Sequence, residues 1–265
     1  MYDEKEDFHL HQQECNTIFD IFNYYNIQVD PNMIVLDLCA GLGMHGGILS
    51  SKFKKIYCSD IINYSTLYDG EFIKLLNEKH KRNNIEIAIN KMAFIENDAM
   101  DMIYKDQFFD MSICINGFEH IPDPRRALFE LGRVTKNGGY IYITFDPIWT
   151  ADSGSHFYHR VNEPWAHLAL SRDQYIARML ANGSNEHEVD EFKNALNRWR
   201  LWQFKTIFHE ITQFFDLETI DFSTWSGVVD DRHYNHPNLD YLLSNGYSRE
   251  ELLLRGIRCV MRKHG

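Results

Sequence analysis

Continuous apolar runs and helically spaced apolar positions alternate along residues 11–146 of the 265-residue chain. Continuous runs, without polar residues at every second position, are typical of strands buried on both faces of a parallel sheet. They predict strands over Met33–Leu38, Lys55–Asp60, Phe94–Met100 and Tyr140–Phe145, and a further strand within the segment Phe108–Pro124. Helical spacing predicts helices over His11–Tyr25, Glu71–His80 and Arg125–Val134. This alternation indicates an α/β fold with a doubly wound, mostly parallel sheet.

The pattern changes after Phe145. Residues 146–170 are rich in aromatic residues and histidines without a clear period, and long loops of this kind are uncommon unless they carry function. Helices are predicted over Ser171–Leu180 and within Asn185–Phe215. The chain then ends with a predicted strand, a capped helix and a last strand, over Leu217–Trp225, Ser248–Leu254 and Gly256–Arg262. A single domain is expected, made of a cap helix, a cofactor-binding core, an inserted substrate lid and C-terminal strands in residues 1–30, 31–146, 147–215 and 216–265.

A glycine-rich loop follows the first predicted strand and is the strongest local signal. Asp37 stands at the end of that strand, and the loop contains Cys39, Gly41 and Gly43. Gly41-x-Gly43-x-x-Gly46 also matches the dinucleotide fingerprint. A fixed carboxylate at position 37 would repel a pyrophosphate, whereas it could hold a cationic amino group. We therefore expect a nucleotide that carries an amino acid.

Polar residues also stand at or near the ends of the next strands. Asp60 ends the second strand and is suited to accept hydrogen bonds from two ribose hydroxyls. Asp98 ends the third and could accept from an exocyclic amine such as that of adenine; the structural alternative is that it caps a helix. The predicted cofactor-binding set is Asp37, Cys39, Gly41, Gly43, Asp60, Ile61, Asp98, Ala99, Asn116 and Gly117.

These motifs, taken in order, resemble the class I S-adenosylmethionine-dependent methyltransferases, especially the group that includes the ubiquinone-biosynthesis enzymes. The resemblance covers roughly residues 32–146, and it includes the Glu-His-Ile-Pro-Asp-Pro segment at 119–124 and the Gly138-Gly139 turn. It implies S-adenosylmethionine as cofactor and a seven-stranded sheet that ends in an antiparallel hairpin, with the lid inserted after strand five. Cys39 departs from the pattern, because many members carry glycine there. We expect a slightly stiffer loop and retained binding.

Composition limits the partners. Lys and Arg number 27 against 38 acidic residues, for a formal charge of −11, and the chain has no large basic cluster. Nucleic acid and anionic membrane surfaces are therefore not expected partners. The five scattered cysteines, the acidic N-terminus and the lack of a 20-residue apolar run favour a cytoplasmic protein without a membrane span.

The lid segments Pro147–Trp149, Gly154–His156 and Pro164–Leu168 resemble inserts in methyltransferases of bacterial capsule and surface-polysaccharide biosynthesis. This resemblance implies a small-molecule acceptor that is a sugar or sugar-like alcohol, carried on a phosphate, nucleotide or polymer. O-methylation of such a hydroxyl is the function that we expect from the sequence.

An alcohol is a poor nucleophile until its proton is removed, and histidine is the usual base near neutral pH. His156 is the first candidate because it follows the small pair Gly154-Ser155; His167 is the second, and His120 follows the fourth strand. A divalent metal held by acids and histidines of the same segment, Asp146, Asp152, His156 and His159, is an alternative. His233 and His236 lie in a polar stretch and are expected to be solvated.

Two other functions remain open. The chain could methylate nitrogen or carbon in another small metabolite, such as an amine or quinone precursor, and an amine acceptor would make the lid histidines dispensable. It could also be a non-catalytic binding protein that retains the fold. The intact acids and glycines of the predicted cofactor site argue against that alternative.

Overall fold

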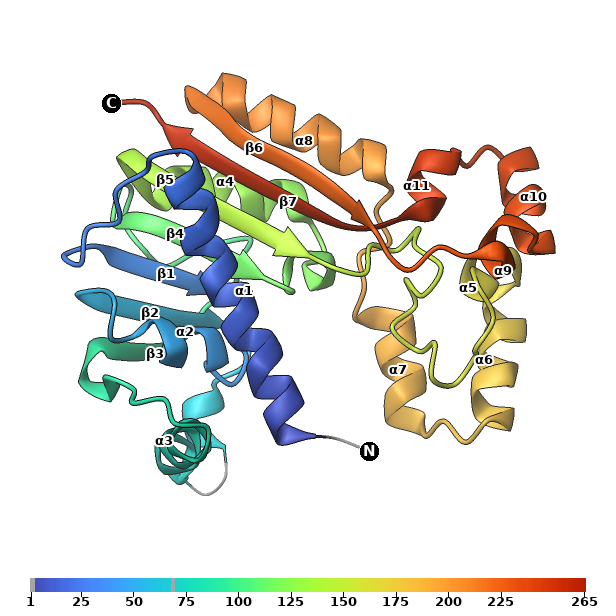
Figure 1. Ribbon diagram of the computed structural model, residues 1–265, viewed down its shortest axis with the longest axis horizontal. Helices are drawn as coiled ribbons and strands as arrows, with labels where there is room; N and C mark the ends of the chain where they lie inside the picture. Colours follow the sequence, from blue (N-terminus) through green and yellow to red (C-terminus); the bar gives the residue numbers. More distant parts are fainter. Residues whose placement is uncertain (1–2, 68–69) are drawn as a thin grey trace.

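The computed structural model describes residues 3–67 and 70–265 and contains one seven-stranded sheet (Figure 1). The strand order is β3-β2-β1-β4-β5-β7-β6, and β7 runs antiparallel to both of its neighbours while the other pairs are parallel. The strands are β1 Ile34–Leu38, β2 Lys55–Asp60, β3 Met92–Glu96, β4 Phe109–Ile115, β5 Thr135–Phe145, β6 Leu217–Ser226 and β7 Leu254–Lys263. The predicted fold class, with its antiparallel C-terminal hairpin, is confirmed.

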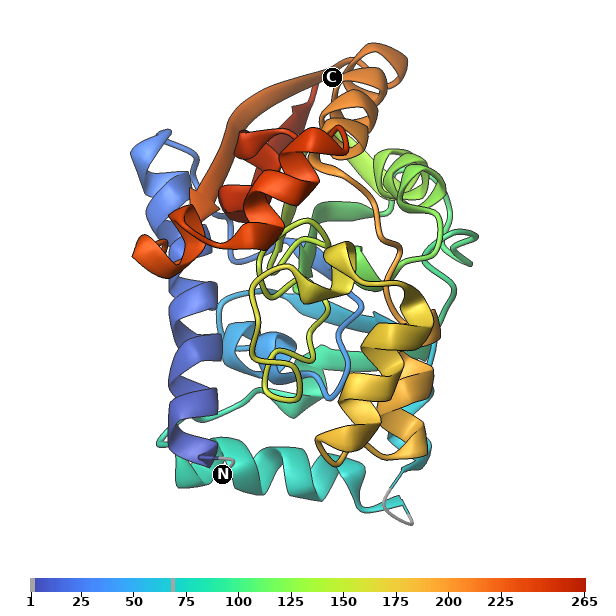
Figure 2. The same cartoon turned by 90° about the vertical axis from the view of Figure 1, so that its right-hand side faces the viewer.

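The helices lie on both faces of the sheet and beyond its carboxyl edge (Figures 1 and 2). In chain order they are α1 Glu4–Tyr24, α2 Met44–Leu49, α3 Phe72–Arg82, α4 Pro124–Val134, α5 Ala166–Ala169, α6 Arg172–Ala181, α7 Glu186–Asn194, α8 Leu201–Phe214, α9 Asp231–Tyr234, α10 Pro237–Ser244 and α11 Arg249–Leu253. One core packs α1, α2 and α3 against the sheet, and the other packs α4 and α8 against the opposite face. Within β4, Met111 and Ile113 belong to the first core and Cys114 to the second, so the sheet is buried on both sides as its continuous apolar runs require.

Several element boundaries differ from the sequence prediction; β5, for example, begins at Thr135 and not at Tyr140. The third strand begins at Met92 and ends at Glu96, so Asp98 lies in the following loop. Helix α1 begins at Glu4, seven residues before the predicted start at His11. Asp3 caps it by accepting from the Lys5 and Glu6 backbone N–H groups, and acidic residues in the first turn favour a helix N-terminus.

The lid lies beyond the carboxyl ends of the parallel strands (Figures 1 and 2). Its loop and helices α5–α7 enclose a small apolar cluster of their own, which includes Phe157, Tyr175 and Phe192. Helix α6 is capped by Ser171, as predicted, and α8 packs against α4 and β6. The lid is tied to the C-terminal segment because the Trp165 indole donates to the Leu252 carbonyl. The sheet edge and the lid therefore face each other across the loops that follow β1, β2 and β4.

Candidate active site

The loop between β1 and α2 is bent by residues in left-handed conformation. Cys39, Gly41 and Gly43 have φ angles of 57°, 50° and 73°. A Cβ atom at Gly43 would lie 2.6 Å from the Phe94 ring, so glycine is required there. Cys39 also adopts this left-handed conformation, which is unfavourable for residues other than glycine. Cysteine therefore strains the backbone at a position where many members of the family carry glycine.

Asp60 joins this loop to the end of β2. Its Oδ2 accepts from the Gly41 backbone N–H at 2.9 Å, and its Oδ1 accepts from the Ile62 N–H at 3.1 Å. Each carboxylate oxygen can accept a second hydrogen bond, so ribose hydroxyls could still be bound. Ile61 beside it is 65 % exposed, and it offers an apolar surface on which a base could pack. The position of Asp60 therefore fits the predicted role.

Asp37 is buried at the end of β1, and its Oδ2 has no hydrogen-bond partner among the described residues. Burial raises the pKa of Asp37 to about 6, an effect partly opposed by His45. The carboxylate has a backbone hydrogen bond from Gly46, but a buried oxygen without a partner is still unfavourable. A nearby ammonium group would compensate it. This orphaned oxygen fits the amino group of an amino-acid-bearing nucleotide.

Replacing Asp37 with Asn is expected to stabilise the cofactor-free protein at pH 8. Because the folded pKa of about 6 lies above the ordinary 3.8, the native state binds more protons across that interval, and the wild type loses stability as pH rises through it. The full loss is about 3 kcal/mol, and Asn removes it. Urea unfolding of both proteins at pH 4 and pH 8 measures the difference. An equal free-energy gap at the two pH values would contradict the ionisation of Asp37.

The end of β4 meets the glycine-rich loop. A Cβ atom at Gly117 would lie 2.4 Å from the Cβ of Cys39, so this close approach requires glycine. The neighbouring Asn116 has a φ of 50°, and its side chain donates to Glu14 of α1 at 2.6 Å. Two of the predicted cofactor positions, Cys39 and Gly117, are thus in contact.

Asp98 and Ala99 lie in the loop after β3. Asp98 Oδ1 accepts from the Met100 backbone N–H at 2.8 Å, so it caps a turn and not a helix. Ala99 packs partly buried against the core. A carboxylate with one oxygen in a turn retains its second oxygen for a ligand. The adenine contact of Asp98 therefore stays a prediction.

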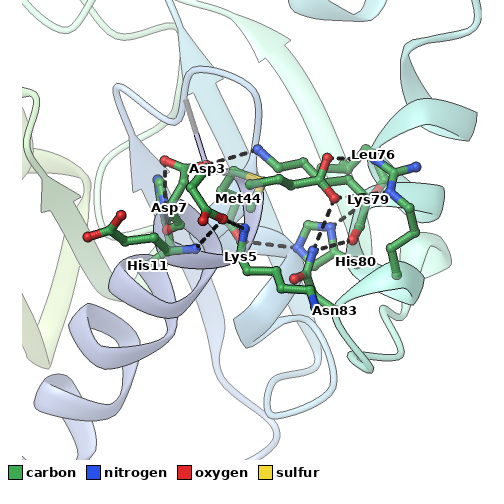
Figure 3. Close-up of polar contacts among 12 residues, drawn as sticks. Asp3, Lys5, Asp7, His11, Met44, Leu76, Lys79, His80 and Asn83 are labelled. Carbon is green, nitrogen blue, oxygen red and sulfur yellow. Dashed lines mark hydrogen bonds and ion pairs between the residues drawn. The ribbon is translucent and has the colours of Figure 1, made fainter. Parts of the chain in front are cut away.

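Helices α1 and α3 frame the cradle, by which we mean the loop 39–43 with Asp37, Asp60 and Gly117. His80 of α3 is buried, and its two ring nitrogens lie 2.9 Å from the Leu76 carbonyl oxygen and 3.4 Å from that of Met44 (Figure 3). Lys79 pairs with Asp7 of α1 at 3.1 Å. These contacts fix α1 and α3 to each other and to the helix that follows the glycine loop.

The turn after Gly117 brings two of the three predicted catalytic histidines together. The ring centroids of His120 and His156 lie 5.2 Å apart, with an interplanar angle of 87°. Glu119 lies beside them, and its Oε1 is 3.8 Å from His120 Nε2. Burial raises the pKa of Glu119 to about 8 and lowers that of His156 to about 4. Glu119 was not among the predicted site residues, although its place next to His120 in the motif was a usable signal.

His167 is buried elsewhere in the lid, with Nε2 2.8 Å from the Trp149 carbonyl oxygen. Burial lowers its pKa to about 4.

The metal site that the sequence offered as an alternative does not assemble, because Asp152 pairs with His233 at 3.1 Å and His159 lies 3.5 Å from Glu188. Of the residues described, the groups that could hold a metal are His11–Glu14–His45 and Glu119–His120–His156. Nor does the described part of the chain contain a helix that is long and apolar enough to cross a membrane.

The fold and the cradle define a class I, Rossmann-like methyltransferase architecture. Residues 36–143 match the family model described as "Methyltransferase domain". With the cradle, this match assigns S-adenosylmethionine as the cofactor, as the sequence predicts. A solved candidate methyltransferase from Bacillus halodurans has a TM-score of 0.55 and 15% identity, and the alignment covers 93% of this chain and 99% of that one. At this identity the likeness shows the fold alone.

Two curated relatives are similar over shorter segments. A chloroplastic 2-methyl-6-phytyl-1,4-hydroquinone methyltransferase of Oryza sativa subsp. japonica is 34% identical over 74 residues, 27% of this chain and 22% of that protein. A demethylmenaquinone methyltransferase of Paenarthrobacter aurescens is 33% identical over 87 residues, 33% of this chain and 29% of that protein. The similarity thus spans less than a third of each relative's length.

Proposed function

We propose that this protein transfers a methyl group from S-adenosylmethionine to a small-molecule acceptor bound between the cradle and the lid. The observation that carries this proposal is the close approach of Gly117 to Cys39. It links the cofactor-binding loop directly to the turn that bears Glu119 and His120. When bound, the cofactor supplies an activated methyl group, because the sulfur that carries it is cationic and departs in an in-line displacement without an acid catalyst.

The residues of the chain must then position the acceptor, exclude water and accept a proton. His156 is the first candidate for the base. Its Nε2 donates to the Pro147 carbonyl at 3.3 Å, so the lone pair of the neutral ring is on Nδ1. Because burial lowers the pKa of His156, the ring is neutral at pH 7 and free to accept. His120 is the second candidate, since its Nδ1 bonds the Ala195 carbonyl at 2.8 Å and leaves Nε2 available.

The acceptor that we favour is a hydroxyl of a sugar or sugar-like precursor in surface-polysaccharide biosynthesis. Its support is the resemblance of the lid segments and the presence of groups that can activate a hydroxyl. A quinone-type acceptor is the second candidate, because the two curated relatives are named for hydroquinone and menaquinone substrates. Turnover with nucleotide sugars but not with hydroquinones would separate the two acceptors.

Titration calorimetry with S-adenosylmethionine and S-adenosylhomocysteine tests cofactor binding, on which the proposed methyl transfer depends. We expect micromolar dissociation constants for both, corresponding to roughly −8 kcal/mol. NAD serves as the matched control, because the carboxylate at position 37 should disfavour its pyrophosphate. Binding of NAD without binding of either sulfur nucleotide would overturn the proposed function.

A further inference from the structure

We propose that Glu119, His120 and His156 bind a divalent transition-metal ion, with Zn²⁺ as the first candidate. Each side chain offers a ligand atom, and these atoms lie within 4.8 Å of one another. Ligand atoms around a zinc ion at ~2.0–2.2 Å lie roughly 3–4 Å apart, so a small inward movement completes the set. Two imidazoles and one carboxylate with open positions are the donor set of catalytic zinc sites.

The other ring nitrogens are already engaged in the way that metal-binding histidines require. His120 Nδ1 bonds the Ala195 carbonyl at 2.8 Å, and His156 Nε2 bonds the Pro147 carbonyl at 3.3 Å. A ring N–H that donates to a backbone carbonyl fixes both the tautomer and the ring orientation, and it directs the opposite lone pair toward the ion. Both histidines therefore present one free nitrogen, held by lid or loop backbone.

Glu119 supplies an independent indication that this cluster suits a cation. The residue is only 4 % exposed, and its Oε2 has no hydrogen-bond partner among the described residues. The nearby Asp146 adds negative charge, and it is itself bonded by the Trp225 indole at 3.2 Å and paired with Arg255 at 3.5 Å. A metal ion would give the orphaned carboxylate oxygen the partner that it lacks.

The second cluster is a less suitable site. Glu14 already pairs with His45 at 2.8 Å through one oxygen, and its other oxygen accepts from Asn116 at 2.6 Å. Binding an ion there would break contacts that hold α1 to the cradle. His11 belongs to this cluster, which makes it a suitable control position.

The metal site stands on its own geometry, and its role rests on the proposed function. The ion would withdraw electron density from an acceptor hydroxyl and lower its pKa, so that the proton is lost to solvent. The oxygen then forms its bond to the methyl carbon, and the carbon–sulfur electron pair stays on sulfur. With the ion bound, His120 and His156 act as ligands, and neither needs to serve as the base. The side chain of His120 is 43% exposed and gives the ion a path from solvent.

The test uses the full chain, stripped with a chelator and titrated with Co²⁺ as a spectroscopic substitute for Zn²⁺. We expect a visible d–d absorption band that saturates at one equivalent and is abolished by Zn²⁺. Glu119→Gln and His156→Ala should each weaken Zn²⁺ binding by ~10–100-fold or more, as measured by competition with a chromophoric chelator. His11→Ala and the exposed lid variant His159→Ala should bind as the wild type does.

Two results would contradict the proposed metal site. An absent band, or a band that persists in Glu119→Gln and His156→Ala and is lost in His11→Ala, would overturn the metal site. Unchanged affinity of these variants for S-adenosylhomocysteine shows that they remain folded. Metal binding without cofactor binding would contradict only the proposed function. Cofactor binding without metal binding would contradict only the metal site.

Discussion

His156→Ala is expected to lower methyl-transfer turnover by ~10²-fold or more while leaving cofactor affinity close to that of the wild type. The ring lies against His120 at the turn that follows Gly117, and alanine removes the only ring nitrogen of this residue that is free to face an acceptor. The same loss follows whether the nitrogen accepts a proton or binds an ion. Release of S-adenosylhomocysteine, measured at saturating cofactor, gives the turnover.

His159→Ala is the matched control, because it removes a lid histidine whose side chain is 60% exposed and which lies beside Glu188. Wild-type turnover in His156→Ala would contradict the assignment and move the role to His120 or His167. If His156 is only a base, Glu119→Gln and the wild type should not differ in Zn²⁺ binding. A metal role predicts that Glu119→Gln loses both Zn²⁺ binding and turnover.

The sheet could be predicted because its strands are continuous apolar runs. The predicted strand Lys55–Asp60 agrees with β2 residue for residue. The third strand was misplaced, because Met92 joins the sheet only by pairing with Ile56 of β2. Such a pairing across many intervening residues leaves no local pattern. β3 lies at the sheet edge, where its side chains are only partly buried and the apolar signal is weak.

The surroundings of the histidines could not be read from the sequence. His233 was expected to be solvated, and this was wrong. It is buried, with its ring nitrogens 3.0 Å from Asp230 and 3.1 Å from Asp152. Asp152 is 81 residues away along the chain, so only the folded lid brings the two together. The same holds for Glu119 and His156, which come from separate loops that meet at the carboxyl edge of the sheet.

The bends of the glycine-rich loop in the cradle were predictable for the opposite reason, since they are set by local backbone. Left-handed conformations at Gly41 and Gly43 and the strand-end carboxylate of Asp60 follow from short segments. What the sequence could not reveal is that Asp60 also organises the loop. Its Oδ2 accepts from the Gly41 N–H, so the side chain that we propose for ribose binding also shapes the cradle.

Asp60→Ala is therefore expected to weaken S-adenosylmethionine binding by an amount on the order of 1–3 kcal/mol, or roughly 5- to 150-fold. The variant loses charge-assisted hydrogen bonds to the ribose hydroxyls and releases the Gly41 N–H. Calorimetry with S-adenosylhomocysteine should give the same loss, because both nucleotides carry the same ribose.

An analogue of S-adenosylhomocysteine that lacks both ribose hydroxyls separates the two contributions of Asp60. Whatever affinity Asp60→Ala loses for this analogue measures the organisation of the loop, and the additional loss for the natural nucleotide measures the ribose contacts. Asp101→Ala, which changes an exposed carboxylate in the loop after β3, is the control for net charge. Equal losses for the analogue and the natural nucleotide would mean that Asp60 shapes the loop and does not bind ribose, whereas unchanged affinity for both would remove Asp60 from the site.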